Sequence, residues 1–324
     1  MGNIRTIGVL TSGGDAPGMN AAIRAVVRAG IYYGYKVLGI KRGFSGLISG
    51  DVEELTPRNV SGIIQHGGTF LKTSRSPEFN TEKGVLKGVS MCKIFGIDAL
   101  TIIGGDGSFR GGLDLSKAGV PVICIPATID NDVGCTDYTI GFDTALNTVS
   151  EALDKIKDTG YSHERVSVLE VMGRKAGYIA INTGIAGGAE VVLIPEEPVD
   201  YEKDVIRPIL EGRNRGKSDF NVIVAEGVEM DVPDIARLIE ERTGITTRYT
   251  ILGYIQRGGI PTVNDRVMAS RMGAKAVMDI HEGKLNRVIA YKNGKVVDFD
   301  IDDALKQTKS IDEDLIELER ILSL

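Results

Sequence analysis

The sequence contains no tryptophan, and it has no apolar run near the roughly 20 residues that a bilayer-spanning helix requires. No charged segment followed by an apolar one precedes the apolar residues 7–10, as it would in a secretory leader. We therefore expect a protein that is neither secreted nor membrane-spanning and that works in the cytoplasm.

Cysteine is scarce and irregularly placed. Cys92, Cys124 and Cys135 are odd in number, stand at unrelated spacings and form no CxxC pair. Disulfide frameworks and structural zinc sites both need paired or clustered cysteines. We predict three reduced thiols.

Positive charge is in deficit, because 38 Lys and Arg stand against 44 Asp and Glu, a formal net charge of −6. Proteins that bind nucleic acid or anionic lipid present a basic face that releases counterions. The composition argues against both classes, although a local basic pocket stays open.

Glycine is abundant, with 41 residues in 324, beside 42% hydrophobic and 25% charged residues. This balance is typical of a globular α/β protein with many tight strand-to-helix turns. Short apolar runs alternate with amphipathic stretches, which predicts βαβ units and a largely parallel sheet. The predicted strands are 6–10, 36–40, 99–103, 122–125, 167–171, 191–194, 221–225 and 250–252.

The C-terminal part of the chain has a different pattern. Segments 287–291 and 295–299 flank Asn293-Gly294, a strong hairpin signal, and residues 313–322 are predicted to be helical. The length favours two lobes, with a boundary near residue 140. The predicted fold class is α/β, with two doubly wound, mainly parallel-sheet lobes and the active site in the cleft between them.

The first strand leads into a glycine-rich turn, Thr11–Gly18, and then a helix predicted over 19–29. Glycines let a ligand approach the backbone, and a helix N-terminus favours anions. A plain βα turn explains the same residues, and the P-loop pattern GxxxxGK[ST] is absent.

A second glycine-rich turn, Gly104–Gly112, follows the strand at 99–103. A dinucleotide fingerprint starting at Gly105 would need glycine where Arg110 stands, which weakens an oxidoreductase reading. Asp106 between glycines suits a carboxylate held beside nucleotide phosphates to engage Mg²⁺.

Two carboxylates, Asp130 and Asp132, follow the strand at 122–125. In extended backbone they would face the same way, so that one could accept a hydroxyl proton while the other holds metal, as phosphoryl transfer requires. A solvated turn is the alternative.

Arginines occupy matching turns in the second half, Arg174 within Met172–Gly177 and Arg257 after the strand at 250–252. Arginine binds phosphate through two parallel hydrogen bonds. We expect the second lobe to grip a phosphorylated substrate.

These segments together resemble the diagnostic segments of the bacterial ATP-dependent 6-phosphofructokinase family, in the same order and over nearly the whole chain. The matching segments are Leu10–Gly18, Gly104–Gly111, Pro126–Asp132, Glu170–Arg174 and Ile255–Gly259. NAD kinases and diacylglycerol kinases share the Gly104-Gly-Asp-Gly element, so Thr128–Asp132 and Met172–Arg174 are the segments that narrow the family.

The resemblance implies a glycolytic kinase, a transferase that moves the γ-phosphate of Mg·ATP to the 1-hydroxyl of fructose 6-phosphate. Asp130 would be the general base, with Thr128 and Gly14 beside it, and Arg174 would stabilise the transferring group. Asp106 and Asp132 would hold Mg²⁺. The implied nucleotide site is Gly14, Phe44, Arg75, Ser76, Asp106, Gly107, Ser108 and Gly111. The implied sugar-phosphate site is Thr128, Asp130, Asp132, Arg165, Met172, Gly173, Arg174, Glu226, Arg248, Tyr254 and Arg257.

The resemblance also implies a homotetramer, in which Arg165 and Arg248 reach the active site of a neighbouring subunit. Residues 1–141 with 256–306 would bind ATP, and residues 142–255 with 307–324 would bind fructose 6-phosphate. An allosteric site for ADP or phosphoenolpyruvate would involve Arg24, Arg28, Arg58, Lys157, Glu190 and Lys217. Arg24 and Arg28, one helical turn apart, would otherwise repel each other.

Two positions refine these expectations. Tyr254 stands where the family has a histidine that contacts the 6-phosphate, which predicts weaker sugar-phosphate binding with catalysis retained. Pyrophosphate-dependent relatives carry Asp at Gly107 and Lys at Ala127, so the small residues here favour ATP. A pyrophosphate-dependent enzyme, a NAD- or lipid-kinase relative and a non-catalytic binding protein remain the alternatives.

Overall fold

The computed structural model describes residues 4–323, which divide into two compact units. The first comprises the described chain up to Ile129, with Val133–Thr144 and Arg257–Lys309. The second comprises Asp130–Asp132, Ala145–Gln256 and the described chain from Ser310. Among the described residues, no helix combines the length and the apolar character needed to span a bilayer.

The first unit is built on a seven-stranded sheet in the order β11-β10-β5-β4-β1-β2-β3. Strands β2, β1, β4, β5 and β10 run parallel to one another, and the edge strands β3 and β11 pair antiparallel with β2 and β10. The bounds are β1 Thr6–Ser12, β2 Lys36–Ile40, β3 Val52–Glu54, β4 Ala99–Gly104, β5 Val122–Pro126, β10 Arg287–Lys292 and β11 Lys295–Asp300.

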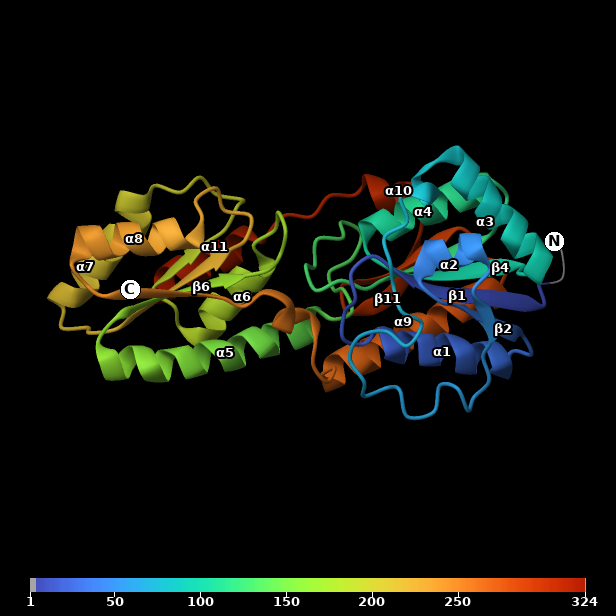
Figure 1. Ribbon diagram of the computed structural model, residues 1–324, viewed down its shortest axis with the longest axis horizontal. Helices are drawn as coiled ribbons and strands as arrows, with labels where there is room; N and C mark the ends of the chain where they lie inside the picture. The colour runs from blue at the N-terminus through green and yellow to red at the C-terminus, as the bar shows by residue number, and fades with distance from the viewer. Residues whose placement is uncertain (1–3, 324) are drawn as a thin grey trace. The chain divides into compact units, whose positions relative to one another are not determined.

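Helices cover both faces of this sheet (Figure 1). On one face, α2, α3, α4 and α10 pack their apolar side chains onto β1, β2, β4, β5 and β10. On the other face α1 and α9 lie against each other. The bounds are α1 Met19–Tyr32, α2 Gly43–Ser49, η1 Glu78–Asn80, α3 Glu82–Phe95, α4 Asp106–Lys117, α9 Val263–His281 and α10 Ile301–Lys306.

The second unit has a four-stranded, fully parallel sheet in the order β7-β8-β6-β9. Its strands are β6 Val166–Val171, β7 Val191–Leu193, β8 Phe220–Ala225 and β9 Thr247–Ile251. Helices α7 and α8 pack on one face, and α6 and α11 contact each other on the other side (Figure 1). The remaining bounds are α5 Phe142–His163, α6 Tyr178–Gly187, η2 Glu202–Ile206, α7 Arg207–Asn214, α8 Val232–Thr243, η3 Gly253–Arg257 and α11 Glu313–Leu322.

The predicted α/β class with mainly parallel sheets is confirmed, as are the hairpin around Asn293-Gly294 and the helix at 313–322. The prediction for β9 was wrong at its start, since the strand begins at Thr247 and not at residue 250. Four of its five residues are exposed, so the apolar signal that marks buried strands is weak there. The short edge strand β3 was missed, because two of its three residues are glutamates.

The three cysteines are free thiols in the core of the first unit. Burial raises the pKa of the Cys92 and Cys135 thiols to about 11, and it raises the pKa of Cys124 as well. All three thiols are therefore protonated at neutral pH.

Candidate active site

Asp130 stands in a turn after β5, and its side chain is fully buried. Its Oδ2 lies 3.2 Å from Nε of Arg174, whose side chain is 59% exposed. A carboxylate removed from water needs a charged or hydrogen-bonding partner, and Arg174 supplies one to Asp130.

The expected extended backbone at Asp130–Asp132 was wrong. Asn131 adopts the left-handed conformation, with φ of 52°, which asparagine tolerates better than most residues. The turn buries Asp130 completely and leaves Asp132 half-buried, so the two carboxylates do not share one face. Asp132 instead lies near Tyr178, whose pKa is raised by burial and by the charges of Glu196 and Asp132.

Arg174 is held by a loop in a strained conformation. Gly173 has a φ of 142° and Arg174 a φ of 57°, a region that non-glycine residues seldom occupy. One carboxylate oxygen of Glu226 accepts the backbone N–H groups of Gly173 at 3.3 Å and of Arg174 at 2.6 Å. Such strain persists only where the surroundings fix it, which is characteristic of functional sites.

The Met172–Arg174 loop is also held by a residue that follows β9. Gln256, which is fully buried just after β9, accepts the backbone N–H of Met172 at 3.0 Å and donates to the carbonyl of Gly253 at 3.1 Å. The carboxyl ends of β8, β6 and β9 thus meet at the Met172–Arg174 loop. In parallel sheets this edge is where ligands bind.

In the first unit, the two glycine-rich turns pack on each other. A Cβ on Gly104 would lie 2.4 Å from the carbonyl oxygen of Ser12, so only glycine fits. A Cβ on Gly107 would meet nothing within 4 Å, so open space lies beside the first turn of α4. Asp106 is the first residue of α4, and its carboxylate pairs with Arg110 at 3.3 Å.

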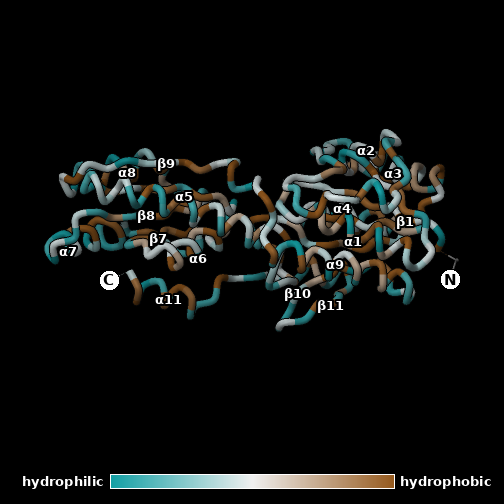
Figure 2. The backbone as a smooth tube through the Cα atoms, turned by 90° about the horizontal axis from the view of Figure 1, so that it is seen from below, coloured by the Kyte–Doolittle hydropathy of each residue, from teal (hydrophilic) through white to brown (hydrophobic). Residues whose placement is uncertain are grey.

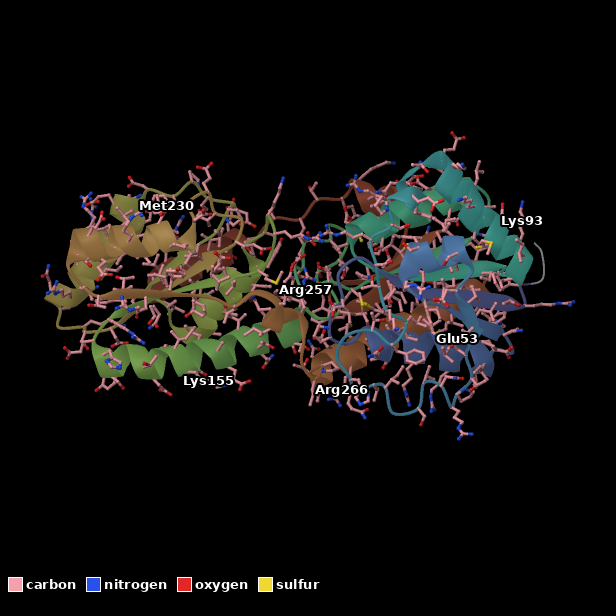
Figure 3. All side chains as sticks on the ribbon, viewed as in Figure 1. Glu53, Lys93, Lys155, Met230, Arg257 and Arg266 are labelled. Atoms are coloured by element: carbon pink, nitrogen blue, oxygen red, sulfur yellow. The ribbon has the colours of Figure 1, made fainter. Side chains whose placement is uncertain are left out.

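Arg257 belongs to the first unit, whereas Arg174, with which the sequence grouped it, belongs to the second. Its guanidinium covers Gly14, because a Cβ there would lie 2.4 Å from Nη1, and the same nitrogen donates to the carbonyl of Asp15 at 3.3 Å. Arg257, labelled in Figure 3, therefore lies on the glycine-rich turn of the first unit.

Phe44 packs mainly into the core. It is 6% exposed, its ring centroid lies 4.1 Å from that of Phe79, and its ring abuts Gly111. Little of its surface is left for a nucleotide. Arg75 is exposed and Ser76 half-buried in the loop between β3 and α3, while Ser108 is buried in the first turn of α4.

Arg165 and Arg248 lie at the opposite end of the second sheet from Arg174. Arg165 precedes β6 and Arg174 follows it, which separates them by about 20 Å of extended strand. Arg248 pairs in register with Ser167, near the same starting end. The two arginines therefore do not join Arg174 within one chain.

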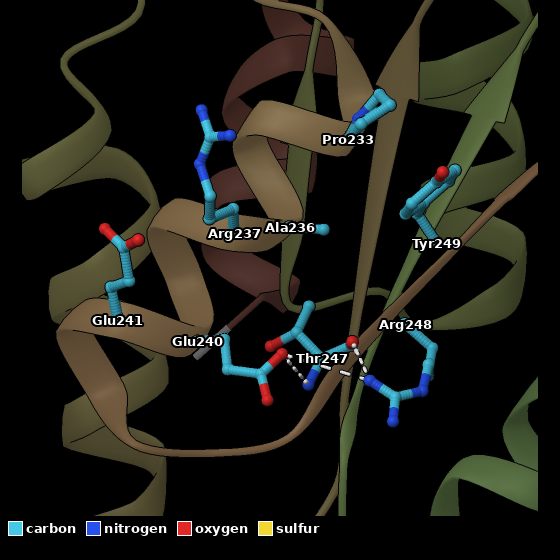
Figure 4. Close-up of a pocket in the computed structure, with 8 residues that line it drawn as sticks. All are labelled: Pro233, Ala236, Arg237, Glu240, Glu241, Thr247, Arg248 and Tyr249. Atoms are coloured by element: carbon cyan, nitrogen blue, oxygen red, sulfur yellow. Dashed lines mark hydrogen bonds and ion pairs between the residues drawn. The ribbon is translucent and has the colours of Figure 1, made fainter.

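Arg248 borders a hollow of about 440 Å³ between α8 and β9 (Figure 4). It donates to the carbonyl of Thr247 at 2.9 Å and lies 3.9 Å from Glu240. Tyr254 stands in η3 with 84% of its surface exposed. Both side chains are accessible on the surface of the chain.

The residues of the expected effector site fall into two groups. Arg24 and Arg28 lie on α1 and belong, with Arg58, to the first unit. The second unit holds Lys157, which donates to the carbonyl of Gly187, and the ion pair of Lys217 with Glu190.

The described residues contain no cluster of three or more metal-ligating side chains. Mg²⁺ is commonly held by one or two carboxylates together with substrate phosphates, so this arrangement fits a metal that arrives with a nucleotide. Asp106 is the first residue of α4 and stands beside the open space at Gly107.

Two supporting residues were not predicted. Gln256, which lies in η3, fixes the Arg174 loop together with Glu226, which the resemblance had implied. Glu196, which accepts the N–H of Gly177 at 2.9 Å, was not predicted.

Glycine-rich turns at a strand-to-helix junction, open space for an anion and a buried carboxylate paired with an exposed arginine define the class of phosphotransferases. The phosphofructokinase family model matches residues 6–280. The chain belongs to the phosphofructokinase family.

Individual relatives agree with this assignment. The chain is 56% identical over 320 residues to the ATP-dependent 6-phosphofructokinase of Clostridium botulinum strain Hall, covering 99% of this chain and all of the relative. It is 52% identical over 321 residues to the enzyme of that name from Alkaliphilus metalliredigens, again covering 99% of this chain and all of the relative.

The crystal structure of Pichia pastoris phosphofructokinase in the T-state has a TM-score of 0.90 and 35% identity. It covers 100% of this chain, and this chain spans 38% of that longer one.

Proposed function

We propose that this protein is a glycolytic kinase that transfers the γ-phosphoryl group of Mg·ATP to the 1-hydroxyl of fructose 6-phosphate. The products are fructose 1,6-bisphosphate and ADP. The observation that carries the proposal is the fully buried Asp130 paired at 3.2 Å with Arg174 in a strained, hydrogen-bonded loop. The full-length similarity to ATP-dependent enzymes supports the same reaction.

Asp130 accepts the proton of the 1-hydroxyl as its oxygen attacks the γ-phosphorus. The carboxylate is pre-formed for this role, because its pairing with Arg174 offsets the cost of keeping a charge buried. Thr128, two residues earlier and 8% exposed, lies beside the reacting groups in this proposal.

Arg174 stabilises charge on the transferring group. Its backbone is fixed by Glu226 and Gln256 through the Met172–Arg174 loop, so the guanidinium requires little reorganisation during the reaction. Its exposed side chain leaves donors free to turn from Asp130 toward a phosphoryl oxygen.

ATP is the proposed donor. The open space at Gly107 leaves room for the α-phosphate, where a carboxylate would repel it. Ala127, which is 1% exposed, offers no cation in the place of the lysine of pyrophosphate-dependent relatives. The phosphates lie along Gly14, Asp106, Gly107 and Ser108, and Arg75, Ser76 and Gly111 border the nucleotide.

Mg²⁺ bound with the nucleotide would neutralise phosphate charge, and Asp106 and Asp132 are the residues that would hold it. The family is one of kinases that generally need this ion. The remaining steps are performed by side chains of the chain itself.

The active enzyme is proposed to be a cytoplasmic homotetramer. The Arg248 side chain is 62% exposed, and Arg165 is half-buried. Arg165 and Arg248 lie at the starting end of their strands, away from Arg174, so a neighbouring subunit is the site they can serve. There they bind the 6-phosphate, with Met172, Gly173, Glu226, Tyr254 and Arg257 completing the sugar-phosphate site.

Regulation by ADP or phosphoenolpyruvate is proposed at Arg24, Arg28, Arg58, Lys157, Glu190 and Lys217. Because the first three belong to one unit and the last three to the other, each group can present cations to an anionic effector.

The proposal is tested by an assay that couples fructose 1,6-bisphosphate formation to NADH oxidation. We expect turnover with fructose 6-phosphate and Mg·ATP, and turnover with pyrophosphate at least about tenfold slower, since each 1.4 kcal/mol of discrimination gives that factor. Turnover with pyrophosphate and none with ATP would overturn the donor. Phosphorylation of NAD or diacylglycerol in place of fructose 6-phosphate would overturn the acceptor.

A further inference from the structure

Asp265 is a fully buried carboxylate on the first turn of α9 that the proposed reaction does not use. It accepts four hydrogen bonds from one stretch of chain. Its Oδ1 accepts hydrogen bonds from the hydroxyl of Tyr138 and, at 2.7 Å, from the N–H of Gly141. Its Oδ2 accepts hydrogen bonds from the hydroxyl of Thr144 and, at 2.8 Å, from the N–H of the same residue.

This bonding differs from ordinary helix capping. An acidic residue at this position of a helix commonly reaches back to the N–H of the capping residue. Here the N–H of the capping Thr262 donates instead to Thr144 Oγ1 at 3.0 Å. The Asp265 carboxylate is thereby directed away from its own helix and toward residues 138–144.

Residues 138–144 in turn hold the chain that leads to Asp130. The N–H of Ile140 donates to the carbonyl of Pro126 at 3.0 Å, and Ile140 forms an isolated parallel bridge with Ala127. The hydroxyl of Thr139 donates to the carbonyl of Thr128 at 2.7 Å. Asp130 follows two residues later.

The same segment also supports the glycine-rich turn after β1. A Cβ on Gly141 would lie 2.6 Å from the Cβ of Ala16, and a Cβ on Gly18 would lie 2.7 Å from Cγ2 of Ile140. The turn that carries Gly14 and the strand end that carries Thr128 therefore rest on one backbone segment.

We propose that Asp265 is a positioning residue for phosphoryl transfer, because its four hydrogen bonds fix the segment that holds both the glycine-rich turn and Pro126–Thr128, the chain that leads to Asp130. Burying this carboxylate is costly, and burial raises its pKa despite the four donors. Precise positioning matters here, because misplacement of the reacting atoms by about 1 Å can lower the rate about 100-fold. The benefit of such positioning would offset the cost of removing the Asp265 carboxylate from water.

The test uses deletions of hydroxyl groups that leave the carboxylate itself in place. Tyr138→Phe removes one hydroxyl donor to Asp265. Thr144→Val removes the other hydroxyl donor and also the acceptor of the Thr262 N–H, and Thr144→Ser restores both bonds. We expect kcat for fructose 6-phosphate and Mg·ATP to fall about tenfold or more in the first two variants, with both KM values within about threefold of wild type. Thr144→Ser is expected to recover kcat to within about threefold of wild type.

Thr183→Val is the matched control, because the Thr183 hydroxyl is also fully buried and donates to a backbone carbonyl, that of Ile179 within α6. Its kcat is expected to stay at the wild-type value even if its thermal midpoint falls. Asp265→Asn, if it folds, is expected to lose the most activity.

A merely structural role predicts lower thermal midpoints with unchanged kcat in Tyr138→Phe and Thr144→Val, and that result would overturn the inference. Equal loss in Thr144→Val and Thr144→Ser would overturn it as well. The inference rests on the proposed function, but different results would contradict each. A wild-type protein without turnover would contradict the proposed function. Normal turnover in the variants would contradict only the positioning role of Asp265.

Discussion

At the residue scale, the candidate site combines a carboxylate without exposed surface and an arginine that is more than half exposed. Asp130 has Arg174 as its charged partner at 3.2 Å, and in the proposed reaction the exposed Arg174 side chain turns toward a phosphoryl group. The backbone around them is fixed by Glu226 and Gln256, whose hydrogen bonds hold the strained loop. Charge and rigidity are thus supplied by different residues.

Tyr254 provides a prediction at this scale. A tyrosine hydroxyl offers the 6-phosphate one neutral hydrogen bond, whereas a protonated histidine offers a charge-assisted one worth about 1 kcal/mol more. Tyr254→His is expected to lower KM for fructose 6-phosphate about fivefold at pH 6.5 and to leave kcat unchanged.

Initial-rate kinetics at fixed Mg·ATP measure this effect. Tyr161→His is a suitable control, because that tyrosine is also strongly exposed, at 71%, and lies on α5. An unchanged or higher KM in Tyr254→His would count against a phosphate contact at this position.

The sequence predicted the chemistry of these residues better than their geometry. Asp106, Asp130 and Arg174 were identified by their residue type directly after strands; Asp130 and Arg174 lie in turns, whereas Asp106 is the first residue of α4. The left-handed turn at Asn131 was not predictable, because asparagine allows that conformation without requiring it. Asp265 was missed because an acid in the first turn of a helix ordinarily indicates no more than a favourable dipole interaction.

At the element scale, α11 docks on the second unit through few contacts of mixed character. It contacts α6, its Arg320 pairs with Glu197 at 2.6 Å, and hydrophobic and hydrophilic residues alternate along it (Figure 2). Glu319, on the same helix, is partly buried. Burial, with the charge of Glu197, raises its pKa from 4.5 to about 7, opposed by Arg320.

This raised pKa predicts a pH-dependent stability. Between pH 4.5 and about 7 the folded chain binds a proton at Glu319 that the unfolded chain has lost. The contribution of Glu319 to the free energy of unfolding therefore falls as pH rises through that window. Glu319→Gln removes this loss of stability, because glutamine does not ionise. After discounting for solvent screening, we expect the free energy of unfolding of the variant to exceed that of the wild type by about 1 kcal/mol at pH 8. This difference corresponds to about 2 °C in thermal midpoint, and we expect no difference at pH 4.5.

Thermal unfolding followed by circular dichroism at pH 4.5 and pH 8 measures the gain. Glu317→Gln, an exposed position on the same helix, serves as the control. A gain of equal size at both pH values would show that the carboxyl of Glu319 does not titrate in this window.

Buried strands were predicted from the sequence more accurately than exposed ones. The buried strands β1, β2, β4, β5, β6 and β8 were placed within two residues of their observed bounds, because continuous apolar runs between glycine-rich turns are unambiguous. The exposed edge strands β3 and β9 were missed or shifted, since edge strands carry charged and mixed side chains.

At the scale of the whole molecule, β9 is the feature that bears on assembly. Among the described strands it pairs only with β6 and forms one edge of its sheet. Tyr249 is 50% exposed and Ile251 52% exposed along this edge, followed by Tyr254 and Ile255. An uncovered edge with apolar side chains promotes pairing with another chain.

Ile251→Lys is therefore expected to weaken assembly by placing a charge on this edge. If the wild type is the proposed homotetramer, light scattering after size-exclusion chromatography should show a smaller species for this variant, with a raised KM for fructose 6-phosphate because Arg248 lies on the same strand. Ile94→Lys, at a position 71% exposed on α3, is the control. A wild-type mass for Ile251→Lys would exclude this edge as a subunit contact.

In the proposed reaction Asp130 removes the proton from the acceptor hydroxyl, and the kcat of Asp130→Asn measures that step, with Asp303→Asn as an exposed control. We expect kcat to fall about 100- to 10,000-fold, the usual contribution of a general base, while calorimetry shows fructose 6-phosphate binding within about threefold of wild type. A kcat within tenfold of wild type in correctly folded Asp130→Asn would show that Asp130 is not the base.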